Sequence, residues 1–239
     1  MKKLFGLILF LSSACAFSGI INNQCPQFTV NSTPQYHQDV GDQEICHLNF
    51  AVIYQCKVKA PIAVFEHVTI ASITGPARRK DNFHPDKLVS PQCSASLADY
   101  ASVGKTHDKG HMSPAGNNTQ SEEIMSESFN LSNMVPQVAN NNRGSWKLLE
   151  EAERQWALAP GTDFYIISGG IFDPGHPVIG NGLGIPTRLY KIIIEKNSKK
   201  VQAYLFPNAP IKPATDWPKY QVSMTAIEQA THMRFGLGQ

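Results

Sequence analysis

The chain of 239 residues contains no repeat, low-complexity tract or long linker, which excludes an obvious repeat or multidomain architecture and predicts a single domain over residues 17–239. Its 21 lysines and arginines against 19 acidic residues give a formal net charge of +2, and loss of Lys2 and Lys3 with the leader described below would leave 19 against 19. Global basicity, the usual mark of a nucleic-acid-binding protein, is therefore absent. Any affinity for phosphate must come from local clusters of cations.

Residues 1–16 have the pattern of a secretory signal peptide. Lys2 and Lys3 precede an apolar run over residues 4–11, and small residues with an Ala-x-Ala pattern follow at residues 14–16. This run is too short to cross a bilayer, and no later apolar stretch is long enough. We expect cleavage after residue 16 and an exported protein, periplasmic or extracellular, without stable membrane association.

Four cysteines would remain after this cleavage, an even number that predicts two disulfides in an oxidising compartment. Cys46 and Cys56 flank a predicted strand, whose rise of ~3.3 Å per residue separates them beyond disulfide reach. Two pairings stay open, and we favour Cys25–Cys46 with Cys56–Cys93 over Cys25–Cys56 with Cys46–Cys93. Zinc is the rival interpretation, but no Cys-x-x-Cys pair occurs. Residues 17–46 are then an irregular, disulfide-tied N-terminal arm.

The pattern of apolar residues after this arm predicts strands and helices in mixed order. Residues 50–56 and 62–70, rich in Val, Ile and aromatic residues, are expected to form a strand pair, and residues 75–106 are expected to form loops. The later predicted elements are a short helix at 121–129, a short strand at 130–134, a helix at 145–158, strands at 164–168, 189–195 and 201–206, and a helix at 226–233. The absence of regular alternation predicts an α+β fold.

His111 is the first candidate for chemistry. It lies in a segment bracketed by Gly110 and Pro114, which places it on a turn or a strand end. Histidine titrates near neutrality and can take a proton from water. The spacing from His107 to His111 also suggests a zinc site, but such a pair needs a helix, which the glycine and proline oppose. His111 is therefore a candidate general base, although an isolated histidine is more often structural.

Asn142 and Glu150 are candidates for handling a metal ion. Asn142 precedes the predicted helix at 145–158, where it could cap the helix or could coordinate Mg²⁺ through its amide oxygen. Glu150 lies eight residues further on, roughly 12 Å along a continuous helix. Direct binding of one ion by both side chains is therefore not expected. Glu150 is better suited to orienting metal-bound water.

Several segments of the chain, in this order, resemble the non-specific DNA/RNA endonucleases of the Serratia nuclease and endonuclease G type, whose signature is Asp-Arg-Gly-His. The resemblance covers most of the mature chain, and the ordered set is far more specific than any one fragment. The matching fragments are Phe-Glu-His-Val, Arg-Arg-Lys-Asp-Asn-Phe, Leu-Ala-Asp-Tyr, Asp-Lys-Gly-His-Met-Ser-Pro-Ala, Ser-Phe-Asn-Leu-Ser-Asn-Met-Val-Pro-Gln, Asn-Asn-Arg-Gly-Ser-Trp-Lys-Leu-Leu-Glu and Ile-Ile-Ser-Gly-Gly-Ile-Phe.

This resemblance assigns roles to the main candidates. By similarity, His111 matches the family's general base, and Asn142 matches its direct metal ligand. Glu150 matches the acidic residue that holds the water shell of the metal. Arg79 matches the arginine that contacts the phosphate and stabilises its developing charge, and Arg78 is close enough in sequence to compete for this role.

The resemblance also implies supporting residues. Asn133 matches an asparagine that supports the site, and Asp108 is expected to brace the signature loop. Lys109 stands where most relatives have arginine, which keeps the charge but loses the bidentate fork. We therefore expect an altered substrate affinity or rate rather than lost chemistry. The further local cations that could contact phosphate are Arg78, Lys80, Lys87, Lys105, Arg143 and Lys147.

The fold implied by the resemblance is the ββα-metal nuclease fold, a central, largely antiparallel sheet flanked by helices. The implied activity is Mg²⁺-dependent hydrolysis of DNA and RNA, bound through the phosphate backbone, to products with 5′-phosphate ends. Mn²⁺ or another divalent cation can substitute in such a site. The alternative is a catalytically inactive nucleic-acid-binding protein on the same scaffold. The intact set of His111, Asn142, Glu150 and Arg79 argues against that alternative.

Overall fold

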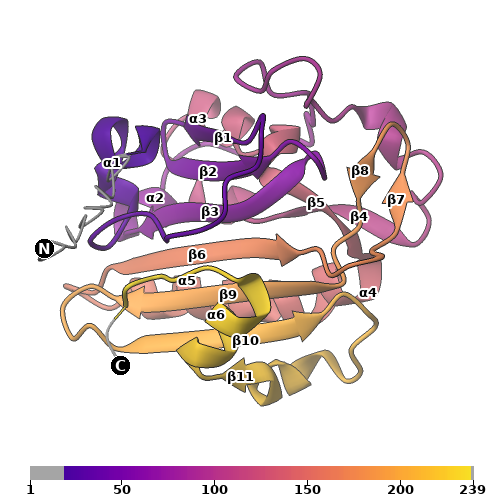
Figure 1. Cartoon of the computed structure of the whole chain (residues 1–239). Helices are drawn as coiled ribbons and strands as arrows, with labels where there is room; N and C mark the ends of the chain where they lie inside the picture. The colour runs from indigo at the N-terminus through magenta and orange to yellow at the C-terminus, as the bar shows by residue number, and fades with distance from the viewer. Residues whose placement is uncertain (1–18, 238–239) are drawn as a thin grey trace, which may run out of the picture.

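The computed structural model describes residues 19–237, so the predicted signal peptide over residues 1–16 lies outside the described part of the chain. A seven-stranded sheet with the order β1-β2-β3-β6-β9-β10-β11 forms its centre (Figure 1). Every neighbouring pair of strands in it is antiparallel. The strands are β1 (Gln43–Cys46), β2 (Phe50–Gln55), β3 (Ala60–Val68), β6 (Phe164–Ile171), β9 (Arg188–Glu195), β10 (Val201–Pro207) and β11 (Gln221–Val222).

Helices and two small sheets surround this central sheet. The first small sheet pairs β4 (His107–His111) with β5 (Met134–Val138), and the second pairs β7 (Val178–Ile179) with β8 (Leu183–Gly184). The α-helices are α1 (Ile20–Gln24), α2 (Ile70–Ile73), α3 (Glu122–Glu127), α4 (Ala139–Asn141), α5 (Lys147–Ala157) and α6 (Met224–Thr231). None of the helices in residues 19–237 is both long and apolar enough to cross a membrane.

Both faces of the central sheet are buried, which explains why its strands are nearly continuous apolar runs in the sequence. Successive side chains of a strand point to opposite faces. In β2, Val52 packs in the core that includes Leu149 of α5, whereas Ala51 packs in the core that includes Ile21 of α1 and Ile227 of α6. Figure 1 shows α6 in front of the strands and α5 behind them. The predicted α+β fold with a central antiparallel sheet flanked by helices is confirmed.

The predicted strand at residues 130–134 is wrong in its position. Leu131–Asn133 forms a 3₁₀ turn, and the strand that follows is β5, which extends to Val138. Pro136 argues against a strand in sequence analysis because it cannot donate a ladder hydrogen bond. Its presence is tolerated because β5 belongs to a two-stranded ribbon, in which Pro136 is paired with Lys109. This ribbon holds the Asp-Lys-Gly-His segment in an extended conformation.

The helix predicted over residues 145–158 is observed as α5, but the helical run begins earlier. It starts with α4 and continues through a π-helical turn at Asn142–Trp146 before α5. Gly144 interrupts the run with φ −110° and ψ −108°. Asn142 has helical dihedral angles inside the run, so it is not the N-cap of this helix. The straight-helix spacing assumed between Asn142 and Glu150 therefore does not apply.

Both disulfides have the favoured pairing. Cys25 is bonded to Cys46 with a Cα–Cα distance of 6.0 Å, and Cys56 is bonded to Cys93 with a Cα–Cα distance of 4.8 Å. The first bond joins the end of α1 to β1, so the N-terminal arm is more regular than predicted. The second joins the end of β2 to the loop that precedes β4. Both therefore restrain the N-terminal half of the described chain.

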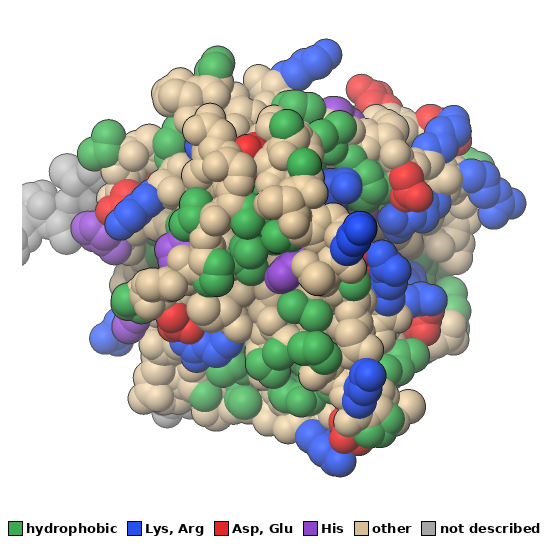
Figure 2. Space-filling view, turned by 90° about the vertical axis from the view of Figure 1, so that its right-hand side faces the viewer, with side chains coloured by type: hydrophobic (Ala, Val, Ile, Leu, Met, Phe, Trp, Pro, Cys, Tyr) green, Lys and Arg blue, Asp and Glu red, His purple; other side chains and the backbone are tan. Residues whose placement is uncertain are grey.

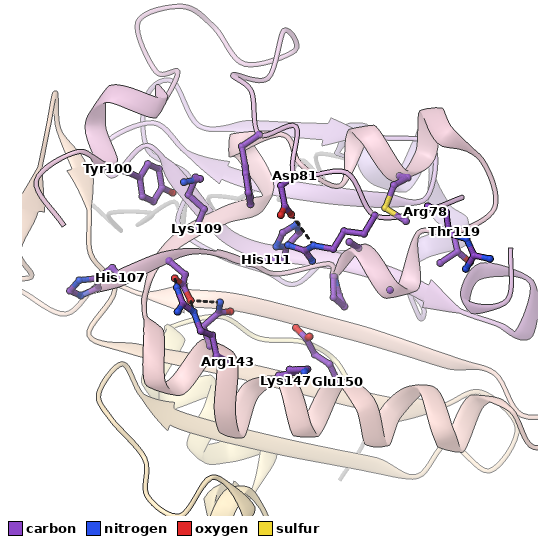
Figure 3. A pocket seen from close by; sticks show the side chains of 18 of the residues that line it. Arg78, Asp81, Tyr100, His107, Lys109, His111, Thr119, Arg143, Lys147 and Glu150 are labelled. Atoms are coloured by element: carbon purple, nitrogen blue, oxygen red, sulfur yellow. Dashed lines mark hydrogen bonds and ion pairs between the residues drawn. The ribbon is translucent and has the colours of Figure 1, made fainter. Parts of the chain in front are cut away.

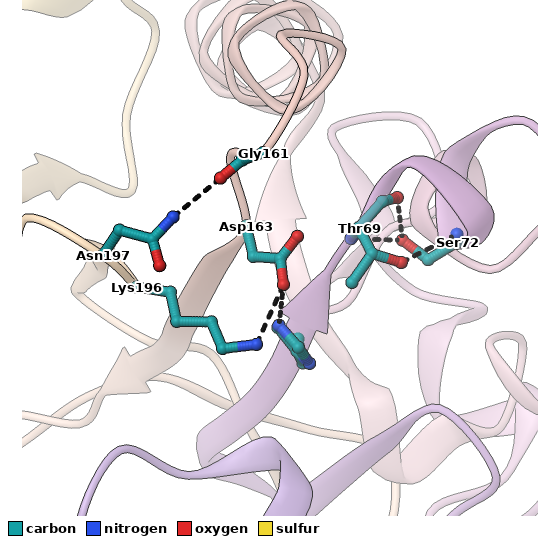
Figure 4. A network of polar contacts seen from close by, with 7 residues as sticks. Thr69, Ser72, Gly161, Asp163, Lys196 and Asn197 are labelled. Atoms are coloured by element: carbon teal, nitrogen blue, oxygen red, sulfur yellow. Dashed lines mark hydrogen bonds and ion pairs between the residues drawn. The ribbon is translucent and has the colours of Figure 1, made fainter.

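A polar network fixes the connection between α5 and β6 (Figure 4). Lys196 Nζ donates to Asp163 Oδ2 at 3.0 Å, and His67 Nε2 contacts the same oxygen at 3.2 Å. Asn197 Nδ2 donates to the carbonyl oxygen of Gly161 at 2.7 Å. These contacts join the turn after α5 to β3 and to the β9–β10 turn. The C-terminal end of α5 is thereby held against the sheet.

Candidate active site

A cavity of about 1110 Å³ lies between the β4–β5 ribbon, the loop before it and α5. Eight of the nine predicted site residues line it, and Asn133 does not. Figure 3 shows His111 between Lys109 and Tyr100 on one side and Arg78 and Thr119 on the other, with Glu150 on the helix below. The fold thus gathers residues from segments up to about 70 positions apart into one hollow. The eight are Arg78, Arg79, Asp108, Lys109, His111, Asn142, Arg143 and Glu150.

His111 ends β4 and is held in one orientation by aromatic rings. Its imidazole meets Phe129 edge-on, with ring centroids 4.9 Å apart, and lies 5.6 Å from the ring of Phe83. Burial, with a smaller contribution from the positive charge of Arg79, lowers the pKa of His111 to about 3. The ring is therefore neutral at physiological pH. Its Nε2 is buried without a hydrogen-bond partner among the described residues, as expected of an atom that meets a bound ligand or water.

Asp108 joins β4 to the π-helical turn. Asn142 Nδ2 donates to Asp108 Oδ2 at 2.8 Å. Arg143 binds both carboxylate oxygens, from Nε at 2.9 Å and from Nη2 at 2.5 Å. Burial tends to raise the pKa of Asp108, but the hydrogen bonds from Arg143 and Asn142 outweigh it and lower the pKa. The amide nitrogen of Asn142 is thus occupied, which leaves its amide oxygen as the atom available to a cation.

Arg79, rather than Arg78, is the arginine whose charge acts on His111. Its guanidinium lies 5.1 Å from the centroid of the Phe129 ring, which packs against His111, and its Nε donates to Asp81 at 2.8 Å. Burial is the larger cause of the lowered pKa of His111, and the positive charge of Arg79 is the second cause. Figure 3 shows Arg78 beside Thr119, away from His111. Of the two candidates, Arg79 therefore fits the role of stabilising charge on a phosphate.

Lys109 is held by aromatic rings at the other end of the cavity. Its ammonium nitrogen lies 4.8 Å from the centroid of the Phe83 ring and 5.5 Å from that of Tyr100. Such cation–π contacts fix a lysine that would otherwise sample many rotamers. Lys109 can therefore present a charge at a defined place, although it lacks the fork of an arginine.

Asn133 supports the site without entering the cavity. Its side chain is fully buried, and its Oδ1 accepts from the Ser113 backbone amide at 2.8 Å. Its Nδ2 donates to the carbonyl oxygens of Ser113 and Ser128, both at 2.8 Å. These bonds position the segment that follows His111. An amide used in this way is not directed at a metal ion.

The comparisons with known proteins agree with this arrangement. Residues 29–239 match the family described as DNA/RNA non-specific endonuclease. The chain belongs to this family. The mitochondrial nuclease EXOG of Homo sapiens is 33% identical over 213 residues, which cover 82% of this chain and 57% of EXOG. The mitochondrial endonuclease G of Homo sapiens is 28% identical over 202 residues, which cover 78% of this chain and 67% of that protein.

A solved structure extends the likeness to the fold. A chain in the crystal structure of the EndoG/EndoGI complex matches with a TM-score of 0.76 and 28% sequence identity, over 87% of this chain and 89% of that chain. The chain spans only 57% of the EXOG sequence from Homo sapiens and 61% of the one from Danio rerio. Its own activity is therefore addressed below as a proposal.

The donor atoms of the cavity suit a hard divalent cation that keeps most of its water. Among residues 19–237, no group of three or more His, Cys, Asp and Glu side chains is arranged to hold a metal ion. Oxygen donors in the cavity include the amide oxygen of Asn142 and the carboxylate of Glu150. The carboxylates of Asp81 and Asp108 also line it, but they are paired with Arg79 and Arg143. Mg²⁺ prefers oxygen ligands, needs few from the protein and retains several waters. The residues present therefore fit Mg²⁺ better than zinc.

Sequence analysis missed a buried polar network beneath the cavity. Lys191 Nζ donates to Glu153 Oε2 at 3.2 Å, and both side chains are fully buried. Glu66 Oε2 accepts from Ser113 Oγ at 2.8 Å, and Glu66 Oε1 accepts from Asn117 Nδ2 at 3.2 Å. Burial raises the pKa of Glu66 to about 8. One signal could have found Glu66 and Lys191, since each is a charged residue within an otherwise apolar strand.

Proposed function

We propose that this protein is a metal-dependent endonuclease that hydrolyses the phosphodiester bonds of both DNA and RNA. The observation that carries the proposal is a neutral, buried His111 that shares one cavity with Arg79, Asn142 and Glu150 in a chain of this family. A neutral imidazole is ready to accept a proton. The guanidinium of Arg79 can stabilise the negative charge of a phosphate, and the oxygen atoms of Asn142 and Glu150 can serve a cation.

The proposed mechanism assigns one task to each side chain. His111 accepts a proton from the water that attacks phosphorus in line. Arg79 stabilises the charge that develops on the phosphoryl oxygens. Asn142 would hold Mg²⁺ directly and Glu150 would orient its water shell, and the ion would supply polarisation of the phosphate and support for the leaving oxygen. The products would carry 5′-phosphate and 3′-hydroxyl ends.

The distribution of charge supports binding through the nucleic-acid backbone. The cavity carries six basic and three acidic side chains, although the whole chain is close to neutral. Figure 2 shows several lysine and arginine side chains gathered toward the right-hand side of the face that it draws. Contacts to phosphate carry no sequence information, so little base preference is expected. The basic side chains are Arg78, Arg79, Lys109, Arg143, Lys147 and Arg154, and the acidic ones are Asp81, Asp108 and Glu150.

A plasmid and RNA digestion assay tests the proposal. Supercoiled plasmid and a long RNA are incubated with the protein and Mg²⁺, Mn²⁺, Ca²⁺ or EDTA, and the ends of the products are mapped. We expect both polymers to be cut with Mg²⁺ or Mn²⁺, no cleavage with EDTA, and 5′-phosphate ends. Binding of both polymers without cleavage under every metal condition would favour the inactive nucleic-acid-binding scaffold instead.

We also propose that the mature protein is exported, to the periplasm or the extracellular space. Its two disulfides support this proposal, because such bonds persist in oxidising compartments and are rare in the cytosol. Sequencing of the amino terminus of the protein purified from the producing cells tests it. A mature protein that begins at residue 17 would support export, and an intact leader would contradict it.

A further inference from the structure

Lys191 is an unusual residue for the middle of the central sheet. It lies in β9 between strands β6 and β10, and its side chain has no exposed surface. Among the described residues it is the only lysine or arginine that is buried. Taking an ammonium group out of water is costly, and a hydrophobic residue of similar volume often serves stability as well or better. The position therefore calls for an explanation beyond packing.

The ammonium group of Lys191 faces one side of α5 and the turn before it. Its Nζ lies 4.6 Å from the centroid of the Trp146 ring and 3.2 Å from Glu153 Oε2. Trp146, Glu150 and Glu153 are spaced four and three residues apart, so they share one face of the helical run. The contacts of Lys191 with the first and the last of them place its charge at the level of Glu150.

Glu150 differs from Glu153 in where it lies. Glu153 is fully buried and is paired with Lys191, whereas Glu150 also lines the cavity. Burial raises the pKa of Glu150, and the positive charge of Lys191 opposes this rise more than the charges of Arg154 and Arg79 do. Both arginines line the cavity, where substrate phosphates would compete for them. Lys191 is thus the cation that reaches Glu150 from the interior, where no substrate can displace it.

We propose that Lys191 is a positioning residue that acts through Glu150. Its ammonium group holds the Glu150 side chain oriented toward the cavity, so that the water shell of a divalent cation is fixed there. Glu153 shares the same ammonium and keeps it at the required place on the helix face. This inference rests on the proposed function, because it assumes that Glu150 serves a cation bound near Asn142.

Binding of Mn²⁺ to the full chain, without substrate, tests this inference independently of catalysis. Free Mn²⁺ is measured by electron paramagnetic resonance for the wild type, Lys191→Met and Glu150→Gln. We expect both variants to bind Mn²⁺ roughly 10-fold or more weakly, the size of effect typical of residues behind a metal ligand. Lys196→Met is the matched control, since Lys196 follows the same strand and loses an ion pair with Asp163 outside the cavity. Its Mn²⁺ affinity should be unchanged.

The double variant Lys191→Met/Glu153→Gln separates positioning from simple charge pairing. It removes both charges of the buried pair. It should therefore regain much of the folding stability that Lys191→Met loses by leaving Glu153 unpaired. If Lys191→Met does not fold, this double variant provides the test of the role of Lys191. The proposal expects its Mn²⁺ affinity to stay low, because Glu150 still lacks its interior cation. Wild-type affinity in this variant, with weak binding in Glu150→Gln, would overturn the role of Lys191 and leave the proposed function intact. Wild-type affinity in both Glu150→Gln and Asn142→Ala would overturn the metal assignment and this inference with it.

Discussion

The side-chain amide of Asn142 donates a hydrogen bond of 2.8 Å to the carboxylate of Asp108, and this contact joins the strand that carries His111 to the helical run that carries Glu150. The bond fixes which end of the Asn142 amide faces the cavity. Arg143 neutralises the same carboxylate with two hydrogen bonds. The side chains of Asp108, Asn142 and Arg143 are thereby oriented before any substrate or cation binds, as expected of a preorganised site.

Asp108→Ala should weaken the binding of the metal ion without removing the chemistry of the site. The change frees the Asn142 amide to rotate, so the Mg²⁺ concentration for half-maximal cleavage should rise, by about 10-fold to 100-fold on the scale typical of residues behind a metal ligand. Asn142→Ala should raise it at least as much. Metal titrations of cleavage measure both. Asp216→Ala, which removes an ion pair with Lys219 outside the cavity, is the control. An unchanged Mg²⁺ requirement in Asp108→Ala would contradict this reading.

His111→Ala should abolish most of the cleavage while leaving the fold intact. Loss of a general base typically costs on the order of 10²–10⁴ in rate. His107→Ala is a matched control, because His107 lines the same cavity at the start of the same strand but lies on the far side of Lys109 in Figure 3. Single-turnover cleavage rates and circular dichroism measure activity and folding. A folded His111→Ala protein that cleaves like the wild type would exclude His111 as the base.

His47 should make stability depend on pH in the alkaline range. Burial opposes its charged form, but the carboxylates of Asp86 at 3.1 Å and Glu127 at 3.9 Å outweigh it and raise the pKa of His47 to about 9. A folded-state pKa above the unfolded value stabilises the fold fully below about pH 6.5, and this stability is lost as pH rises through about 9. The contribution is on the order of 3 kcal/mol.

Urea unfolding of the wild type and of His47→Gln between pH 6 and pH 10 measures this effect. The difference between the two proteins isolates His47 from Glu66, whose raised pKa also makes stability fall as pH rises. The wild type should lose its advantage over the variant across this range. A difference in unfolding free energy that stays constant with pH would show that His47 is neutral in the folded protein.

Reduction of the disulfides should destabilise the fold. Each bond typically contributes ~2–4 kcal/mol, mainly by restraining the unfolded chain. Cys56–Cys93 closes the longer loop, with a sequence separation of 37 against 21 for Cys25–Cys46, so its loss should cost slightly more. Urea unfolding of Cys56→Ser/Cys93→Ser and Cys25→Ser/Cys46→Ser compares them. Four free thiols detected by mass spectrometry in the protein as isolated would contradict the premise.

Local patterns were sufficient to predict five of the seven strands of the central sheet, because β2, β3, β6, β9 and β10 are mostly apolar and are bounded by turn residues. The short edge strands β1 and β11 were not predicted. Local patterns were also sufficient to predict that His111 lies at a strand end, since Gly110 and Pro114 restrict the backbone there. Local patterns did not reveal which strands pair with each other in the fold. Because Pro136 argues against a strand, β5 was not predicted, and its partner strand β4 lies nearly 30 residues earlier in the chain.

The buried network could not be predicted for a similar reason. Lys191 and Glu153 are 38 residues apart and look like ordinary charges, one in a strand and one on an amphipathic helix. Only the packing of α5 on β9 reveals that they form a pair and that Glu150 shares its helix face with that pair. The role of Asp108 is similarly decided by Arg143 and Asn142, which reach it from another element.

Substrate binding should depend on salt with a moderate slope. Of the six basic side chains in the cavity, Arg143 is paired with Asp108 and Lys147 with Glu151. Only a few cations, Arg79 among them, are therefore expected to engage phosphate. Each phosphate contact contributes a slope of about −0.9 to the log–log dependence of affinity on salt for duplex DNA. Lys109→Ala should therefore weaken the binding of random-sequence DNA and RNA alike and make the slope shallower by about one. Lys200→Ala, which lies outside the cavity, is the control and should change neither the affinity nor the slope. Cleavage rates measured with subsaturating substrate at several salt concentrations give the slope. Cleavage at a single sharp sequence motif, or a lack of activity toward one of the two polymers, would contradict binding through the phosphate backbone.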